Sequence, residues 1–267
     1  MAPLIHYTRK GHGAPPLVLV HGFGCARSDW DAVVGHFASR HETVAVDLGG
    51  HGETPGGLEH RRIETHGEDV AELLRSLKLP PAIVLGHSMG CRVAMEAALR
   101  APQFVKAVVL VDGSRLGTPG STAHIDRAKA MEQAGYGPFI KGAFEQMFAP
   151  GFDKDIVSGI VQRALDRDPA IAGPLFIDIG RYDAENMDRV LESLTVPLLA
   201  IQTTWTNAQG QRVSMTAGQT TPYLDLIRRA VPKALIEVIP DTGHFPQLER
   251  PAETNAIIES FLRGLPA

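Results

Sequence analysis

The pentapeptide G-H-S-M-G at residues 86–90 constrains the fold of this chain more than any other stretch. The apolar run Ala82–Leu85, typical of a buried strand, precedes it, and a run rich in small and apolar residues, typical of a helix, follows it. A serine on a sharp strand-to-helix turn is held in a strained conformation with its hydroxyl exposed, and flanking glycines let the turn close without a Cβ clash. Taken alone, the pattern also fits a glycine-rich turn with a solvated serine.

Apolar runs with β-branched residues recur along the chain and alternate with helical patterns. The runs that predict strands are Leu17–Val20, Thr43–Val46, Ala82–Leu85, Val105–Val111, Val196–Ile201 and Ala234–Ile239. Because these runs are mostly apolar, they fit strands covered on both faces, as in a parallel sheet. The alternation predicts an α/β fold with a doubly wound, mostly parallel sheet. Reactive groups should then gather beyond the carboxyl ends of the strands.

The segment 117–188 interrupts this alternation, because it contains helical stretches and no clear strand. Half of the phenylalanines lie in it: Phe139, Phe144, Phe148, Phe152 and Phe176. We therefore expect a helical cap with an apolar underside, inserted after the strand Val105–Val111. An ordinary helical subdomain with its own core is the alternative. The predicted domains are a core formed by residues 1–116 and 189–267, and a cap formed by residues 117–188.

Composition excludes several classes of partner. A net charge of -4 and a pI near 6.3 argue against nucleic acid or an anionic membrane as the main partner. Cys25 and Cys91 do not make a disulfide framework or a metal cluster, and they are typical of small buried residues in a reducing compartment. The N-terminal residues lack the apolar region of a signal peptide, and no apolar run approaches the length of a membrane span. We therefore expect a cytoplasmic protein without a membrane partner.

Two further motifs can supply the chemistry that a serine nucleophile needs. H-G-F-G at residues 21–24 follows a predicted strand, and a glycine-containing turn there can direct a backbone N–H toward the serine. The N–H groups of Phe23 and Met89 would then form an oxyanion hole. The H-G-x-G pattern alone fits any tight turn, and we expect His21 itself to be structural.

A histidine beyond the last predicted strand is the candidate base. T-G-H-F-P at residues 242–246 follows that strand, so His244 can reach the serine from the same edge of the sheet. Histidine suits this role because its ordinary pKa, about 6.5, lets it take and return a proton near neutrality. His87, inside the pentapeptide, is expected to be a packing or hydrogen-bonding neighbour.

In this order and spacing the motifs resemble the α/β-hydrolase superfamily over nearly the whole chain. The matching segments are H-G-F-G at 21–24, D-L-G-G-H-G-E-T at 47–54, G-H-S-M-G at 86–90 and G-H-F-P-Q-L-E-R-P at 243–251. The resemblance implies that Ser88 is the nucleophile and His244 the base, with Phe23 and Met89 as oxyanion donors and a structural role for Asp47. It says little about the substrate, because this fold hosts many chemistries.

The acid of the triad departs from the superfamily pattern. Many members carry it in a loop after the penultimate strand, but residues 202–211 contain no carboxylate, and Thr206 or Asn207 falls where the acid is expected. We expect Asp112, at the end of the strand Val105–Val111, to replace it. This position is similar to that of the acid in certain dehalogenases and cofactor-free dioxygenases.

An aspartate at position 112 would accept a hydrogen bond from the ring N–H of His244 and fix the tautomer of that ring. Other interpretations stay open at this point. Asp112 could merely cap the next turn, a common use of aspartate. Asp225 could be the acid, although its context is typical of a solvated helix start, and the triad could lack a carboxylate.

The expected function is a serine hydrolase that cleaves a carboxylic ester or lactone through an acyl-enzyme on Ser88, with no metal and no organic cofactor. The expected partner is a small molecule with an apolar acyl or alcohol group, and the oligomeric state is left open. Related sequences suggest two other enzymes: a C–C bond hydrolase of ring-fission products, and a cofactor-free dioxygenase that uses the His244–Asp112 pair to deprotonate a hydroxylated heteroaromatic. The non-enzyme alternatives are a hormone receptor that retains the triad and a scaffold that loses it; the presence of Ser88 and His244 argues against the scaffold.

Overall fold

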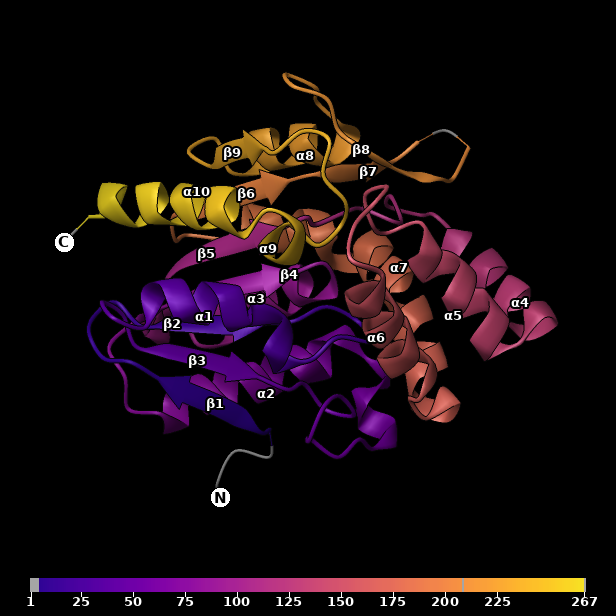
Figure 1. Cartoon of the computed structure of the whole chain (residues 1–267), viewed down its shortest axis with the longest axis horizontal. Coiled ribbons are helices and arrows are strands. Elements are labelled where there is room, and N and C mark those ends of the chain that lie inside the picture. Colours follow the sequence, from indigo (N-terminus) through magenta and orange to yellow (C-terminus); the bar gives the residue numbers. More distant parts are fainter. Residues whose placement is uncertain (1–4, 208, 267) are drawn as a thin grey trace.

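A computed structural model describes residues 5–207 and 209–266. Within these ranges one sheet of seven strands has the order β1-β3-β2-β4-β5-β6-β9 (Figure 1). Its strands are β1 (Tyr7–Lys10), β2 (Leu17–Val20), β3 (Thr43–Val46), β4 (Ala82–His87), β5 (Val105–Val111), β6 (Leu198–Gln202) and β9 (Leu235–Val238). Only the β1–β3 pair is antiparallel. The prediction of a mostly parallel α/β sheet is confirmed.

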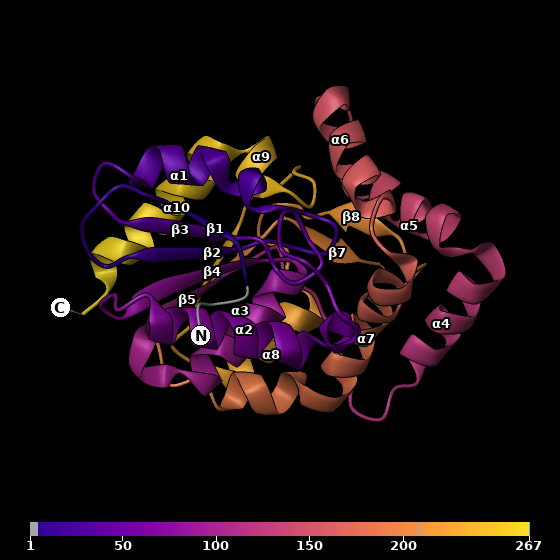
Figure 2. The same cartoon turned by 90° about the horizontal axis from the view of Figure 1, so that it is seen from below.

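Helices cover both faces of the sheet (Figure 2). One face carries α1 (Asp31–Phe37), α9 (Pro246–Glu249) and α10 (Pro251–Gly264), and the other carries α2 (Ile63–Ser76), α3 (Met89–Arg100) and α8 (Pro222–Ala230). The alternation of side chains along a strand explains the two layers. In β2, Leu17 packs in the same core as Trp30 beside α1, whereas Val18 packs with the residues of α2 and α3. No helix in the described ranges is long and apolar enough to cross a membrane.

The sequence-based prediction missed three short strands. β1 is polar and mostly exposed, because it lies at an edge of the sheet and pairs only with β3. β7 (Thr204–Thr206) and β8 (Arg212–Ser214) form a separate antiparallel hairpin after β6. None of the three has the continuous apolar run that marks the central strands, so their pairing comes from tertiary context.

Helices connect β5 to β6 at the carboxyl ends of the central strands (Figure 1). They are α4 (Ala123–Ala134), α5 (Tyr136–Glu145), α6 (Lys154–Leu165) and α7 (Pro169–Glu192). α7 runs past the expected cap boundary at residue 188, and its buried residues Val190 and Leu191 share a core with the helices on the sheet. The predicted boundary at residue 188 therefore lies inside a continuous helix rather than in a linker, and the name cap is used below for residues 117–188.

Cys25 and Cys91 are both buried, and each is a free thiol, as expected from the sequence. Cys91 lies in the first turn of α3, with its Sγ 3.1 Å from the carbonyl oxygen of Gly86. This contact places the small side chain inside the turn that carries Ser88.

Candidate active site

Ser88 lies at the turn between β4 and α3, with φ 55° and ψ -114°. A positive φ is strained for a serine, and such strain persists only where the surrounding structure fixes the backbone. Here the N–H of Ser88 donates to the carbonyl oxygen of Val111 at 3.0 Å. A Cβ at position 90 would lie 2.4 Å from the carbonyl oxygen of Val20, so glycine lets α3 begin directly against β2.

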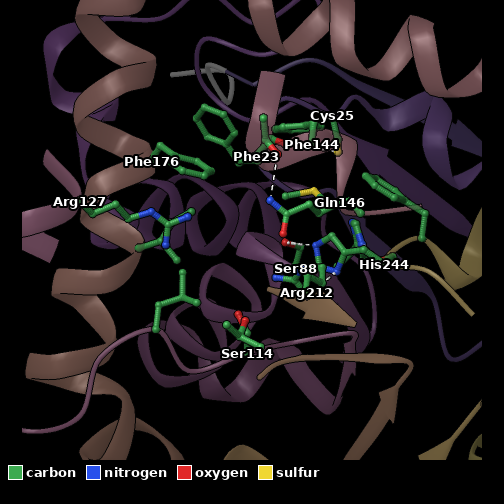
Figure 3. A pocket seen from close by; sticks show the side chains of 18 of the residues that line it. Phe23, Cys25, Ser88, Ser114, Arg127, Phe144, Gln146, Phe176, Arg212 and His244 are labelled. Carbon is green, nitrogen blue, oxygen red and sulfur yellow. Dashed lines mark hydrogen bonds between the residues drawn. The ribbon is translucent and has the colours of Figure 1, made fainter. Parts of the chain in front are cut away.

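The structure brings Ser88, His244 and Asp112 into one hydrogen-bonded chain (Figure 3 shows the Ser88–His244 pair). His244 Nε2 lies 2.7 Å from Ser88 Oγ, and His244 Nδ1 lies 2.6 Å from Asp112 Oδ2. Asp112 directly follows β5, which is parallel to β4, and the two strands are in register at His87 and Val111. Ser88 and Asp112 therefore leave neighbouring strands at the same edge of the sheet, and the loop before α9 carries His244 to them.

Asp112 is fully buried, and all of its side-chain contacts suit a charged carboxylate. Its Oδ1 accepts the N–H groups of Thr203 and Thr204, at 2.7 and 2.8 Å, and the hydroxyl of Thr204 donates to Oδ2. Burial by itself would raise the pKa of Asp112, but the hydrogen bond and charge of His244, with Arg212 and Thr204, outweigh burial and lower it. Asp112 thus binds the segment after β6, rather than capping the turn that follows it.

The other residues considered for the acid lie elsewhere. Asp225 is about half-exposed in the first turn of α8, where it accepts hydrogen bonds from Thr220 and Arg228 at 2.7 and 2.8 Å. Its position is the solvated helix start that its sequence context indicates. Asn207 joins the ends of the β7–β8 hairpin, because its N–H donates to the carbonyl oxygen of Gln211 at 2.9 Å.

Arg212 is a contact of the site that the sequence did not reveal. It projects from β8, and its Nη1 lies 3.2 Å from His244 Nδ1, 3.6 Å from Asp112 Oδ2 and 2.6 Å from the Thr204 hydroxyl. Burial and then repulsion from Arg212 lower the pKa of His244 to about 4, against the opposing effect of Asp112. The imidazole is therefore neutral at neutral pH, which is the form that a base requires.

The loop that carries His244 is fixed from both sides. His87 Nε2 donates to the carbonyl oxygen of His244 at 2.7 Å, which confirms His87 as a hydrogen-bonding neighbour. Glu249 accepts the N–H groups of Gly243 and Ala149, at 2.9 and 3.1 Å, and so joins this loop to the cap. Glu249 stands inside the motif at 243–251, but this role could not be predicted from the motif.

The predicted oxyanion donors, Phe23 and Met89, lie in two turns that meet at Ser88. Met89 is the first residue of α3, where backbone N–H groups have no partner within the helix. The turn that carries Phe23 packs against the serine, because a Cβ on Gly22 would lie 3.1 Å from Ser88 Cβ. This placement agrees with the expected role of the two N–H groups, which stays a prediction.

His21 and Asp47 are structural, as expected. The ring of His21 joins two loops, because Nδ1 donates to the carbonyl oxygen of Gly22 and Nε2 accepts the N–H of Leu48. The carboxylate of Asp47 accepts the N–H groups of Arg27 and Glu53, at 2.8 and 3.0 Å. These bonds hold the loops after β2 and β3 together.

Ser88 and His244 open into a cavity of about 500 Å³ between the core and the cap (Figure 3), which we call the triad cavity. Its apolar lining includes Phe23, Phe139, Phe144 and Phe176, and its charged lining consists of Arg92, Arg127 and Arg212. The other two cap phenylalanines stack outside it, since Phe148 lies between Phe152 and Phe245 with ring centroids 6.1 and 4.8 Å away. The cap thus contributes an apolar wall and also one charge, that of Arg127, which the sequence-based prediction did not include.

A family model described as "Alpha/beta hydrolase family" matches residues 17–257. The chain belongs to this family. The alpha/beta hydrolase is 25% identical, over 97% of its length, to the dihydrolipoyllysine-residue acetyltransferase component of an acetoin cleaving system from Cupriavidus necator, of which it spans 67%. It is 28% identical to an sn-1-specific diacylglycerol lipase from Mus musculus, over 93% of this chain and 81% of the lipase.

Among solved structures, the alpha/beta hydrolase is similar to Est816, described as an N-acyl homoserine lactone degrading enzyme. The TM-score is 0.76 at 25% identity, and the match covers 96% of each chain. The family description and the lipase among the relatives support a hydrolase as the class of this protein.

In this alpha/beta hydrolase a buried ion pair connects α3, the helix that follows Ser88, to the cap. Arg92, one turn after Ser88 on α3, donates from Nε and Nη2 to both carboxylate oxygens of Asp183 on α7, at 2.7 and 2.6 Å. Arg92 also donates to the carbonyl oxygens of Ser88 and Ser114, at 3.1 and 2.8 Å. A single guanidinium therefore holds together the turn that carries Ser88, the segment after β5 and the cap.

Proposed function

We propose that this chain is a serine hydrolase that cleaves a carboxylic ester or lactone through an acyl-enzyme on Ser88. The observation that carries the proposal is the continuous hydrogen-bonded chain Asp112–His244–Ser88, which ends at a cavity suited to a small molecule. A solvated serine in a glycine-rich turn would not need a buried neutral histidine, nor a buried carboxylate behind that histidine.

In the first half-reaction, Ser88 Oγ attacks the carbonyl carbon while His244 Nε2 takes its proton. Asp112 accepts the Nδ1–H of His244 and stabilises the imidazolium that forms. The N–H groups of Phe23 and Met89 bind the oxyanion, and removing one such donor typically costs about 2.7–4 kcal/mol of transition-state stabilisation. His244 then gives its proton to the leaving alkoxide, and the acyl group stays on Ser88.

In the second half-reaction, water attacks the acyl carbon and gives a proton to His244. The tetrahedral intermediate collapses, the acid leaves, and the proton on His244 returns to Ser88 Oγ. A lactone follows the same steps, except that its alcohol stays attached to the acyl group until the acid is released.

The similar proteins support the reaction class and not a particular substrate. One is named a lipase, one a lactone-degrading enzyme and one an acetyltransferase component, so each name involves an acyl group bonded to oxygen or to another acceptor. Because identity to each is below 30%, the proposal takes from them only the acyl-transfer step.

The position of Asp112 also favours a second candidate, a cofactor-free dioxygenase. Asp112 lies at the end of β5, and residues 202–211 contain no carboxylate, which is the arrangement that resembles those enzymes. The His244–Asp112 pair could then deprotonate an acidic hydroxyl of a heteroaromatic ring that lies in the triad cavity. Oxygen uptake with a hydroxylated heteroaromatic, measured beside ester hydrolysis, separates the two candidates.

The test of the proposed hydrolase is covalent labelling together with turnover. A fluorophosphonate probe should label Ser88, and mass spectrometry should find the label on its peptide. The Ser88→Ala variant should lose both labelling and hydrolysis of p-nitrophenyl esters, whereas Ser193→Ala, on an exposed side chain that only bonds within its own helix, should keep both. Equal labelling of native protein and Ser88→Ala would overturn the acyl-enzyme.

A further inference from the structure

Arg127 is a cation that lines the triad cavity. It projects from α4, and Figure 3 shows its guanidinium directed into the cavity on the side away from Ser88. Its Cζ lies 4.6 Å from the ring centroid of Phe176. Within residues 5–207 and 209–266 no ion pair involves Arg127, although Asp126, next to it on the same helix, pairs with Lys129 at 3.6 Å.

The other charged groups at the cavity do not neutralise the charge of Arg127. Arg92 is neutralised by its bidentate contact with Asp183, and Asp112 faces Arg212 and His244. His244 is neutral at neutral pH, since its pKa is lowered to about 4. Three guanidinium groups thus line the cavity, and two of them face carboxylates, Asp183 and Asp112, that do not line it. The net charge of these five side chains is about one positive unit.

Such a cation is costly unless something binds to it. Burial, followed by repulsion from Arg212 and Arg92, lowers the pKa of Arg127 to about 10, so the group stays charged at neutral pH. Charged side chains that lose water usually gain a partner of opposite sign. The contact with Phe176 satisfies one face of the guanidinium plane and leaves its N–H groups directed at the cavity.

We propose that the triad cavity binds an ester or lactone that carries a carboxylate away from the scissile carbonyl, and that Arg127 binds this carboxylate. The planar fork of a guanidinium matches a carboxylate with two parallel hydrogen bonds. The phenylalanines of the lining then contact the apolar part of the substrate, between the carboxylate at Arg127 and the carbonyl at Ser88. This assignment rests on the proposed function and narrows its substrate class from an apolar ester to an anionic one.

The kinetic test uses pairs of esters that differ only in charge. In one pair, the p-nitrophenyl monoester of adipic acid is compared with its analogue in which a methyl ketone replaces the carboxylate. In a second pair, the alcohol part of the ester, instead of the acyl part, carries either the carboxylate or the methyl ketone that replaces it. The native protein should prefer the carboxylate in at least one pair. Arg127→Met should lower kcat/KM for that carboxylate ester by about tenfold to a hundredfold, the range expected for a hydrogen bond to a charged group, and change the neutral ester by less than about twofold.

Two variants make the result specific. Arg127→Lys keeps the charge and should retain part of the preference, because an ammonium lacks the bidentate fork. Lys129→Met removes an exposed charge from the same helix and should leave the preference unchanged. Native protein that hydrolyses both members of each pair equally, with no effect of Arg127→Met, would overturn the anionic substrate and leave the proposed hydrolase standing.

A binding arm separates failure of the inference from failure of the proposed function. The Ser88→Ala protein is titrated calorimetrically with monomethyl adipate and with its methyl ketone analogue. If Ser88→Ala binds the carboxylate ligand and the double variant with Arg127→Met does not, the assignment of Arg127 is supported. This holds even if the native protein turns over no ester, and in that case the hydrolase proposal is the one that fails. Equal binding of both ligands in both proteins would overturn the assignment of Arg127.

Discussion

Ser88 and Asp112 share a backbone feature that determines how the site is assembled. Both have positive φ, 55° and 44°, and both directly follow central parallel strands that are neighbours in the sheet. The register of the two strands fixes the distance between Ser88 and Asp112. His244 is therefore the one residue of the three that a loop has to position. The superfamily pattern would lead one to look for the acid near the β7–β8 hairpin, but here the hairpin supplies Thr204 and Arg212 as contacts of Asp112, the proposed acid.

The role of Asp112 can be tested by removing its charge alone. In Asp112→Asn the amide can no longer hold the His244 tautomer in the same way, so kcat for an ester should fall by about 10²–10⁴. Circular dichroism should show an unchanged fold. Asp225→Asn, on an exposed helix start, serves as the control and should be close to native activity. A fully active Asp112→Asn beside a crippled Asp225→Asn would move the acid to the later position.

Arg212 should set the acid limb of the pH–rate profile. A base must be deprotonated, so kcat/KM should be constant above the pKa of His244, about 4, and fall as the pH drops below that value. Arg212→Met removes one of the effects that lower this pKa, and the acid limb should move to higher pH. The profile of kcat/KM for native protein and variant measures the shift directly; superimposable profiles would show that Arg212 does not act on His244.

At the scale of elements, α7 is the helix that joins the cap to the core. Its Asp183 is buried against Arg92, so Asp183→Ala leaves a buried guanidinium without its partner and should reduce the free energy of unfolding by about 3–5 kcal/mol. Asp188→Ala, also on α7, breaks a more exposed pair with Arg115 and should cost less than about 1 kcal/mol. Urea denaturation of both variants checks the difference, and equal losses would contradict the interpretation.

α5 contributes Phe144 to the triad cavity, and this side chain should limit the length of the acyl group. Phe144→Ala opens space next to the apolar wall, so the ratio of kcat/KM between longer and shorter esters should rise. This ratio does not depend on how much protein is folded, which matters because a buried Phe→Ala change costs about 3–5 kcal/mol. Phe152→Ala, stacked outside the cavity, is the matched control and should leave the ratio as it is.

The elements differ in how far their sequences reveal them. β2, β3 and β5 begin and end where their apolar runs do, because a strand buried on both faces must be apolar along its length. β7 and β8 have no such run, and their pairing depends on the loop that joins them.

The same contrast holds for the site: Ser88 and His244 stand in local motifs, and Asp112 was found because the later loop lacks a carboxylate. Arg212 and Arg127 could not be identified, since their neighbours come from the hairpin and the cap only after folding.

Across the whole molecule, buried histidines make stability depend on pH. Burial lowers the pKa of His21 and His244 to about 4 and of His66 and His87 to about 3, and that of His51 well below its ordinary value. Below pH 6.5 the unfolded chain therefore binds protons that the folded protein does not, and stability should fall as the pH drops from 6.5 toward about 4. Each such histidine contributes a slope of up to about 1.4 kcal/mol per pH unit.

His60 acts in the opposite direction, because its hydrogen bond to Asp69 raises its pKa. Urea denaturation across this pH range should still show the net loss. His66→Gln removes one titrating group while keeping a donor for the carbonyl oxygen of His60, and it should make the slope shallower. Stability that stays level down to about pH 4 would show that the buried rings are protonated in the folded protein.

The bonds around His244 also bear on how a substrate enters. The N–H of His244 donates to the carbonyl oxygen of Met147 in the cap, and Glu249 binds Ala149 of the same cap segment. A movement that lifts this side of the cap would pull the imidazole away from Ser88 and interrupt the proton relay. Ser88, the proposed nucleophile, would then lack its base whenever that side of the cap is open to water. The site could therefore not be open on that side and reactive at the same time. Entry along any other side of the cap would leave the relay intact.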